Sequence, residues 1–115
     1  MNVVDSSAWL EYLAAGPNAA FFAEAIEKVS ELVVPTISIY EVFKRILQQR
    51  SENEALQVVA VMQQGRVSEM DSTVALSAAR ISIDHKLPMA DSVMLATAKL
   101  NRAAMTTHFL SNRMG

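Results

Sequence analysis

The chain has 115 residues, 51% of them hydrophobic and 19% charged, a formal net charge of −2 and no cysteine. These values predict one globular domain over residues 1–115, and they exclude disulfides, zinc–thiolate sites and cysteine nucleophiles. The charged fraction lies below the usual quarter, which leaves apolar surface for a partner or a second copy. The lack of a basic excess argues against a large phosphate-binding surface, although bound cations can supply positive charge locally.

Nothing near the N-terminus is typical of a secretion signal, because Asp5 stands where a signal peptide is basic and no apolar core follows. No apolar run approaches the length of a membrane span. We therefore expect a cytoplasmic protein that is not embedded in a membrane.

Short apolar runs alternate with helical patterns along the chain. β-Branched residues in short continuous runs suit strands that are buried on both faces. The predicted strands are residues 3–4, 32–34, a weak one near residue 67, and residues 103–105. The predicted helices cover about residues 8–13, 18–29, 38–47, 51–62, 71–83 and 91–101. Strands that alternate with helices imply a parallel sheet with helices on both faces. The last residues, 108–115, show no periodicity and predict an irregular or truncated tail.

Polar residues at the helix starts predict the N-caps, and apolar spacing predicts the faces that meet the core. Ser6 or Ser7 can cap the first helix, and further caps are expected at Asn18, Ser51 and Asp71. The sixth helix is apolar on nearly every face and is expected to be buried. The predicted core stripes are Phe21, Phe22, Ala25, Ile26 and Val29 in the second helix, Ile39, Val42, Phe43, Ile46 and Leu47 in the third, and Ala75, Leu76, Ala79 and Ile83 in the fifth.

Three carboxylates stand at junctions between these elements. Asp5 follows the first strand, Glu41 lies near the start of the third helix, and Asp91 starts the sixth. In a right-handed parallel fold these junctions share one edge of the sheet. Acids that are placed together repel one another, so such a cluster normally binds a divalent cation. Oxygen ligands favour magnesium or manganese, which can activate water for attack on a phosphate.

Each carboxylate also has a purely structural interpretation. Asp5 can cap the first helix, and position alone does not decide between a cap and a site. Glu41 completes a capping box with Ser38, or forms helical ion pairs with Lys44 and Arg45. Asp91 can cap the sixth helix. The occurrence of all three in one short chain, at matching junctions, favours a site.

Other motifs are absent or weak. The chain has no G-x-S-x-G elbow, P-loop or dinucleotide fingerprint. His85 is expected on the surface. Six cations are candidate phosphate contacts, although each is also explained as a solvated side chain: Lys44, Arg45, Arg50, Lys86, Lys99 and Arg102.

Three segments together resemble the PIN-domain nucleases, and most closely the VapC-type toxins of toxin–antitoxin pairs. Residues 3–10 (VVDSSAWL) resemble the family's opening strand and first acid. Residues 34–42 (VPTISIYEV) resemble the start of the helix with the second acid, and residues 87–98 (LPMADSVMLATA) resemble the helix with the third. The resemblance covers residues 1 to about 107.

The resemblance implies a three-layer α/β/α sandwich on a central parallel sheet. It implies an endoribonuclease dependent on Mg²⁺ or Mn²⁺, in which Asp5, Glu41 and Asp91 are the catalytic and metal-binding acids. It also implies an RNA substrate, a small antitoxin protein as partner and a homodimer.

The chain departs from the family's pattern after the last strand, where the family usually places another aspartate. Here residues 105–110 read MTTHFL, and no acidic residue follows Asp91. His108 stands near the missing acid, but imidazole suits magnesium poorly. Three hypotheses follow: a metal-dependent ribonuclease toxin, a catalytically degenerate module that binds an antitoxin or RNA without cleavage, and an Asp5-dependent phosphatase. The phosphatase is disfavoured. Phosphatases that transfer phosphate through such an aspartate need a second aspartate two residues later, and this chain has Ser7 there.

Overall fold

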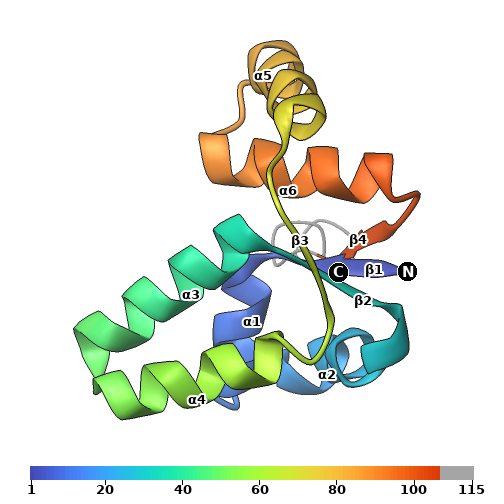
Figure 1. Cartoon of the computed structure of the whole chain (residues 1–115). Helices are drawn as coiled ribbons and strands as arrows, with labels where there is room; N and C mark the ends of the chain where they lie inside the picture. The colour runs from blue at the N-terminus through green and yellow to red at the C-terminus, as the bar shows by residue number, and fades with distance from the viewer. Residues whose placement is uncertain (107–115) are drawn as a thin grey trace.

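The computed structural model describes residues 1–106, so the predicted tail and His108 lie outside the described residues. Its described strands form one parallel sheet in the order β3-β2-β1-β4 (Figure 1). The strands are β1 (Asn2–Val4), β2 (Leu32–Pro35), β3 (Arg66–Ser68) and β4 (Ala104–Thr106). All four predicted strands are therefore confirmed, each within one or two residues.

The two central strands, β1 and β2, are buried on both faces, as the β-branched runs predict. Val3 and Val33 are paired across β1 and β2, and they pack against Met94 and Ala98 on one face. The next residue along, Val4, points to the other face because side chains alternate along a strand. There it joins a larger core with Trp9, Phe22 and their neighbours.

The helices cover both faces and complete the three-layer α/β/α sandwich (Figure 1). Helices α1 to α4 share the larger core on one side of the sheet. Helix α6 packs on the other side, and α5 covers α6 from outside. The bounds are α1 (Ser6–Leu13), α2 (Ala19–Glu27), a short 3₁₀ helix η1 (Val29–Glu31), α3 (Thr36–Gln49), α4 (Glu52–Met62), α5 (Ser72–His85) and α6 (Met89–Leu100). No helix within residues 1–106 is long and apolar enough to cross a membrane.

Of the four predicted caps, two are confirmed, one is wrong, and one holds the N-cap position without the capping hydrogen bond. Ser51 accepts a hydrogen bond from the Glu54 amide, and Asp71 accepts one from the Val74 amide. The first helix is capped by Asp5, one residue before the predicted Ser6 or Ser7. Asn18 occupies an N-cap position but makes no capping hydrogen bond with its side chain.

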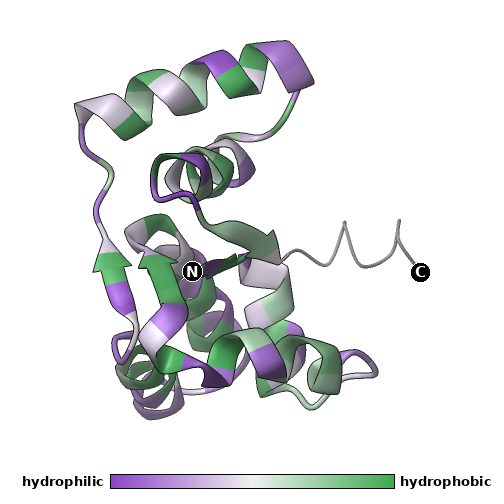
Figure 2. Cartoon of the chain, turned by 90° about the vertical axis from the view of Figure 1, so that its right-hand side faces the viewer, coloured by the Kyte–Doolittle hydropathy of each residue, from purple (hydrophilic) through white to green (hydrophobic). Residues whose placement is uncertain are grey.

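The predicted core face of α5 is wrong. Ala75, Leu76, Ala79 and Ile83 are all exposed, whereas Val74, Ala78 and Ile81 are buried and pack against α6. The hydropathy of α5 does not identify the buried side because the helix is apolar on two opposite sides. Figure 2 shows it as the outermost helix, with apolar segments along its length. Three other residues predicted in core stripes are also exposed: Phe21, Val29 and Leu47.

Candidate functional site

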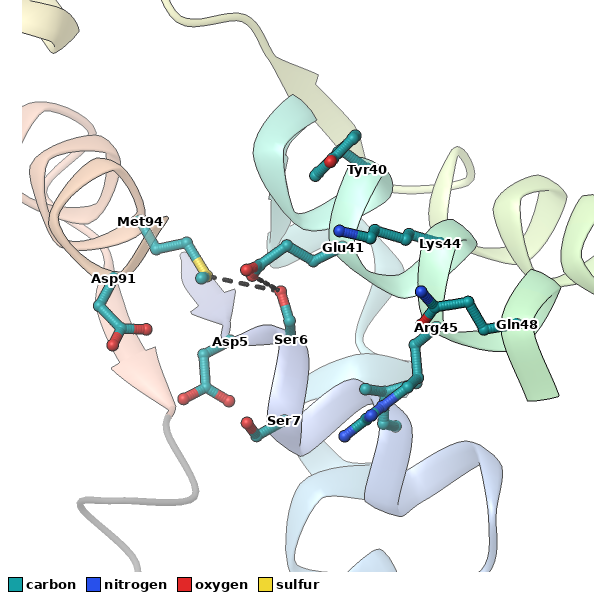
Figure 3. A pocket seen from close by; sticks show the side chains of 11 residues that line it. Asp5, Ser6, Ser7, Tyr40, Glu41, Lys44, Arg45, Gln48, Asp91 and Met94 are labelled. Atoms are coloured by element: carbon teal, nitrogen blue, oxygen red, sulfur yellow. Dashed lines mark hydrogen bonds between the residues drawn. The ribbon is translucent and has the colours of Figure 1, made fainter. Parts of the chain in front are cut away.

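The three predicted acids line one cavity, of about 350 Å³, at the carboxyl end of β1 (Figure 3). Asp5 comes from the end of β1, Glu41 from α3 and Asp91 from α6. The remaining lining residues are Ser6, Ser7, Leu10, Tyr40, Lys44, Arg45, Gln48 and Met94. The three junctions therefore lie at one edge of the sheet, as predicted.

Asp5 is both a helix cap and a cavity residue. Its side chain is 8% exposed, and its Oδ1 accepts a hydrogen bond of 2.8 Å from the Ala8 amide. Its own amide donates to the Thr106 carbonyl oxygen at 3.0 Å, which ties the end of β1 to the end of β4. The two interpretations left open by the sequence are therefore compatible, because the cap fixes the direction of a carboxylate that also lines the cavity.

Glu41 is held by Ser6 rather than by the start of its own helix. The Ser6 hydroxyl donates to Glu41 Oε1 at 2.7 Å and lies 4.0 Å from the Met94 sulfur. Helix α3 begins at Thr36, so Ser38 lies inside the helix and the predicted capping box does not form. The predicted helical ion pairs are also absent: in the described part of the chain, neither Lys44 nor Arg45 pairs with Glu41. Ser6 thus couples α3 to the end of β1.

Asp91 lies in the first turn of α6 and is exposed. The helix begins two residues before it, at Met89, with Pro88 in the N-cap position and no capping hydrogen bond from a side chain. The predicted cap at Asp91 is therefore wrong. Figure 3 shows its carboxylate on the same side of the cavity as that of Asp5, while the Glu41 carboxylate points toward Ser6.

The donor chemistry of the cavity suits a hard divalent cation, because carboxylates and hydroxyls supply only oxygen. The spacing is looser than a finished ligand shell. Within residues 1–106, no three or more histidine, aspartate or glutamate side chains lie close enough together to hold a metal ion. The groups that fit a cation in this cavity are the carboxylates of Asp5 and Asp91. Glu41, which is hydrogen-bonded to Ser6, is the third.

The opposite wall of the cavity is a face of α3. Only some of its residues were predicted to belong to a site. It carries Tyr40, Lys44 and Gln48 at intervals of four residues, with Arg45 beside them. Tyr40 and Gln48 were not singled out as site residues, but each is four residues from Lys44, and this helical spacing was a signal that could have placed them on one face. Of the six candidate phosphate-contacting cations, only Lys44 and Arg45 line this cavity. His85 is exposed, as expected.

Comparisons with known proteins give a consistent result. The sequence profile described as "PIN domain" matches residues 3–108, and no curated protein matches in sequence. A structure described as a toxin–antitoxin complex from Klebsiella pneumoniae is similar, with a TM-score of 0.73 at 18% identity, covering 91% of this chain and 83% of that one. Mycobacterium tuberculosis VapC20, described as a sarcin–ricin loop cleaving toxin, gives 0.74 at 12% identity, covering 90% and 85%. PAE2754 from Pyrobaculum aerophilum gives 0.69 at 18% identity, covering 93% and 79%.

Proposed function

Because the chain belongs to the PIN domain family, we propose that it is a metal-dependent endoribonuclease and the toxin of a toxin–antitoxin pair. The observation that carries this proposal is the meeting of Asp5, Glu41 and Asp91 around one cavity at the end of the sheet. Two similar structures, described as a toxin–antitoxin complex and a sarcin–ricin loop cleaving toxin, support the same assignment. On this proposal the substrate is RNA, the partner is a small antitoxin protein, and the protein acts in the cytoplasm.

The acids would hold Mg²⁺ or Mn²⁺, which supplies positive charge for the phosphate oxygens and lowers the pKa of water that attacks phosphorus. Asp5 is aimed by the Ala8 amide, which restricts the directions its carboxylate can take. Ser6 keeps Glu41 close to the end of β1. Asp91, the exposed member, is the acid most accessible to a strand of RNA. Hydrolysis forms one phosphorus–oxygen bond to water and breaks one to the leaving nucleoside.

The test is cleavage of a labelled RNA by the purified protein with Mn²⁺ and with EDTA. We expect EDTA to abolish cleavage, and Asp5→Asn or Asp91→Asn to lower its rate by at least about 100-fold, as is usual when a catalytic charge is removed. Lys28→Gln, in an exposed ion pair at the C-terminal end of α2, is a control for general changes in charge. Cleavage that survives both EDTA and Asp5→Asn would contradict the proposal.

The loose spacing of the carboxylates favours a second candidate, a degenerate module that binds RNA or antitoxin without cleaving. The chain also has no acid after Asp91. Calorimetry separates the two candidates. A nuclease site should give a saturable heat with Mn²⁺ that is lost in Asp5→Asn, whereas the degenerate module should give none.

A homodimer is also proposed, and the exposed side of α5 supports it. Leu76 is 61% and Ile83 is 80% exposed, and together with Ala75 and Ala79 they form an apolar side opposite α6. Antiparallel pairing of two α5 helices about Ala79 would set each small Ala75 against the partner's Ile83. Asp71 at one end of α5 would then lie near the partner's Lys86 at the other end, which adds charge complementarity.

Sedimentation velocity of the full chain over a range of concentrations tests this dimer. We expect the wild type to associate and Ile83→Glu to remain monomeric, because a buried unpaired charge is costly. Leu56→Glu on α4 is the matched control, since Leu56 is 51% exposed and lies away from α5. A wild type that is monomeric throughout, or a dimer insensitive to Ile83→Glu, would contradict the assignment.

A further inference from the structure

One face of α3 places cations and an aromatic ring beside the carboxylates. Tyr40, Lys44 and Gln48 lie one above another on the cavity wall, each about 6 Å further along the axis, since an α-helix rises about 1.5 Å per residue. Arg45 follows Lys44 in the helix, and its side chain extends along another part of the cavity wall, away from that of Lys44 (Figure 3). The acids gather at the N-terminal part of this wall and the cations follow toward the C-terminal part. We refer to Tyr40, Lys44, Arg45 and Gln48 as the α3 ledge.

The cations of the ledge are not neutralised by neighbouring acids. The ion pairs formed within residues 1–106 are Lys28 with Glu24 and Arg50 with Glu54. Lys44 and Arg45 take part in neither, although Glu41 precedes them by three and four residues. The reason is that the Glu41 carboxylate accepts the Ser6 hydroxyl. Glu41, the nearby acid of α3, therefore bonds to Ser6. Lys44 and Arg45 line the cavity without an ion pair to it.

Tyr40 adds an aromatic surface next to these charges. Its side chain is 59% exposed, and the Lys44 ammonium lies 5.7 Å from the centre of its ring. Such a cation–π contact favours the conformation in which the lysine ammonium lies beside the ring over conformations that extend into solvent. An exposed aromatic ring flanked by unpaired cations is the combination that binds single-stranded nucleic acid, through base stacking and phosphate contacts.

We propose that the α3 ledge binds a single strand of RNA adjacent to the bond that the acids cleave. Lys44 and Arg45 contact neighbouring phosphates, Tyr40 stacks on an unpaired base, and Gln48 donates a hydrogen bond to that strand. The ledge selects single-stranded over duplex RNA because a base inside a duplex cannot stack on a side chain. The identity of the ligand, RNA, rests on the proposed nuclease function. The geometry of the α3 ledge does not depend on that proposal.

The experiment is equilibrium binding of the full chain to a labelled single-stranded RNA in EDTA, by fluorescence anisotropy at several salt concentrations. The double variant Lys44→Gln/Arg45→Gln removes two phosphate contacts. We expect the slope of log affinity against log salt to shrink by about 1.4, and affinity at 0.1 M salt to fall by about 25-fold, from about 0.7 counterion released per contact. The charge-matched control Lys28→Gln/Arg80→Gln changes an exposed cation that follows α2 and another on α5, and it should leave both values unchanged.

The tyrosine arm tests stacking separately. Tyr40→Leu should weaken binding by about 5- to 150-fold without changing the salt slope, whereas Tyr40→Phe retains the ring and should bind like the wild type. A duplex of the same sequence should bind more weakly than the single strand and should respond little to Tyr40→Leu. Single-stranded DNA should bind if stacking and phosphates carry the affinity.

The outcomes separate this assignment from the nuclease proposal. If the double variant and Tyr40→Leu bind RNA as tightly as the wild type while Mn²⁺-dependent cleavage is intact, the ledge assignment is overturned and the nuclease stands. If binding responds as expected but no condition supports cleavage, the ledge stands and the nuclease proposal fails. Equal losses in the double variant and in its charge-matched control would indicate non-specific attraction and would also overturn the ledge.

Discussion

Two substitutions at Asp5 should separate its structural role from its proposed chemical one. Asparagine keeps a side-chain oxygen that can accept the 2.8 Å hydrogen bond from the Ala8 amide, and it serves as well as aspartate at an N-cap. It removes the negative charge that a divalent cation requires. Alanine removes both the cap and the charge.

The expected magnitudes follow from these contacts. Loss of the cap in Asp5→Ala should lower the free energy of unfolding by about 1–2 kcal/mol, since a cap is typically worth about 1 kcal/mol and this one is buried. Asp5→Asn should stay within about 0.5 kcal/mol of the wild type. At this chain length 1 kcal/mol corresponds to about 3–6 °C in melting temperature. Both variants should lose Mn²⁺-dependent RNA cleavage.

Thermal unfolding followed by circular dichroism, together with the cleavage assay, measures both effects. Asp71 provides the matched control, because its Oδ1 accepts from the Val74 amide at 2.9 Å and it caps α5 outside the cavity. Asp71→Ala should lose about 1 kcal/mol, the usual value for an exposed cap, and keep its cleavage rate. Two results would refute the reasoning: an Asp5→Asn variant as unstable as Asp5→Ala, or one that still cleaves RNA at the wild-type rate.

Two further predictions concern side chains away from the acids. Ser38 is fully buried, and its hydroxyl makes no hydrogen bond within residues 1–106, so Ser38→Ala should raise the free energy of unfolding by about 1–2 kcal/mol. Ser82→Ala, which removes a 2.7 Å bond to the Leu87 carbonyl, should lower it by about 1 kcal/mol; a Ser38→Ala melting temperature below that of the wild type would contradict the first expectation. The hydrogen bond to Glu27, assisted by partial burial and by the carboxylate's charge, raises the pKa of Tyr12. The stability it contributes is therefore fully present below about pH 10, the ordinary pKa of tyrosine, and is lost as pH rises through the higher folded value. Spectrophotometric titration should show Glu27→Gln lowering this pKa, and an unchanged titration would refute the cause.

Residues at element junctions could be predicted because local chemistry decides them. A short run of β-branched residues such as Val3 and Val4 predicts a strand whatever its neighbours in space are. Ser51 and Asp71 cap helices through hydrogen bonds from amides three residues away. The three acids were placed at one edge because parallel topology brings the carboxyl ends of strands together. The strands and caps depend only on short-range geometry. The shared edge depends only on the general handedness of the connections between parallel strands.

Contacts between distant segments could not be predicted in the same way. The bond from Ser6 to Glu41 joins residues 35 apart, and Glu41 makes this bond in place of the predicted helical ion pairs. Lys44 and Arg45, beside the acids, form no ion pair within residues 1–106. No spacing rule within α3 contains this information, because the partner of Glu41 comes from the start of α1.

The sequence by itself determined the order of strands and helices, the two-sided sheet and the meeting of Asp5, Glu41 and Asp91. These follow from hydropathy period, β-branching and the right-handed crossover, which act along the chain. Only the tertiary structure decided which side of α5 is buried, that Asp5 caps α1 while it lines the cavity, and that Ser6 holds Glu41. Those outcomes depend on which surfaces pack together, and a helix with two apolar sides can bury either one until its neighbours are in place.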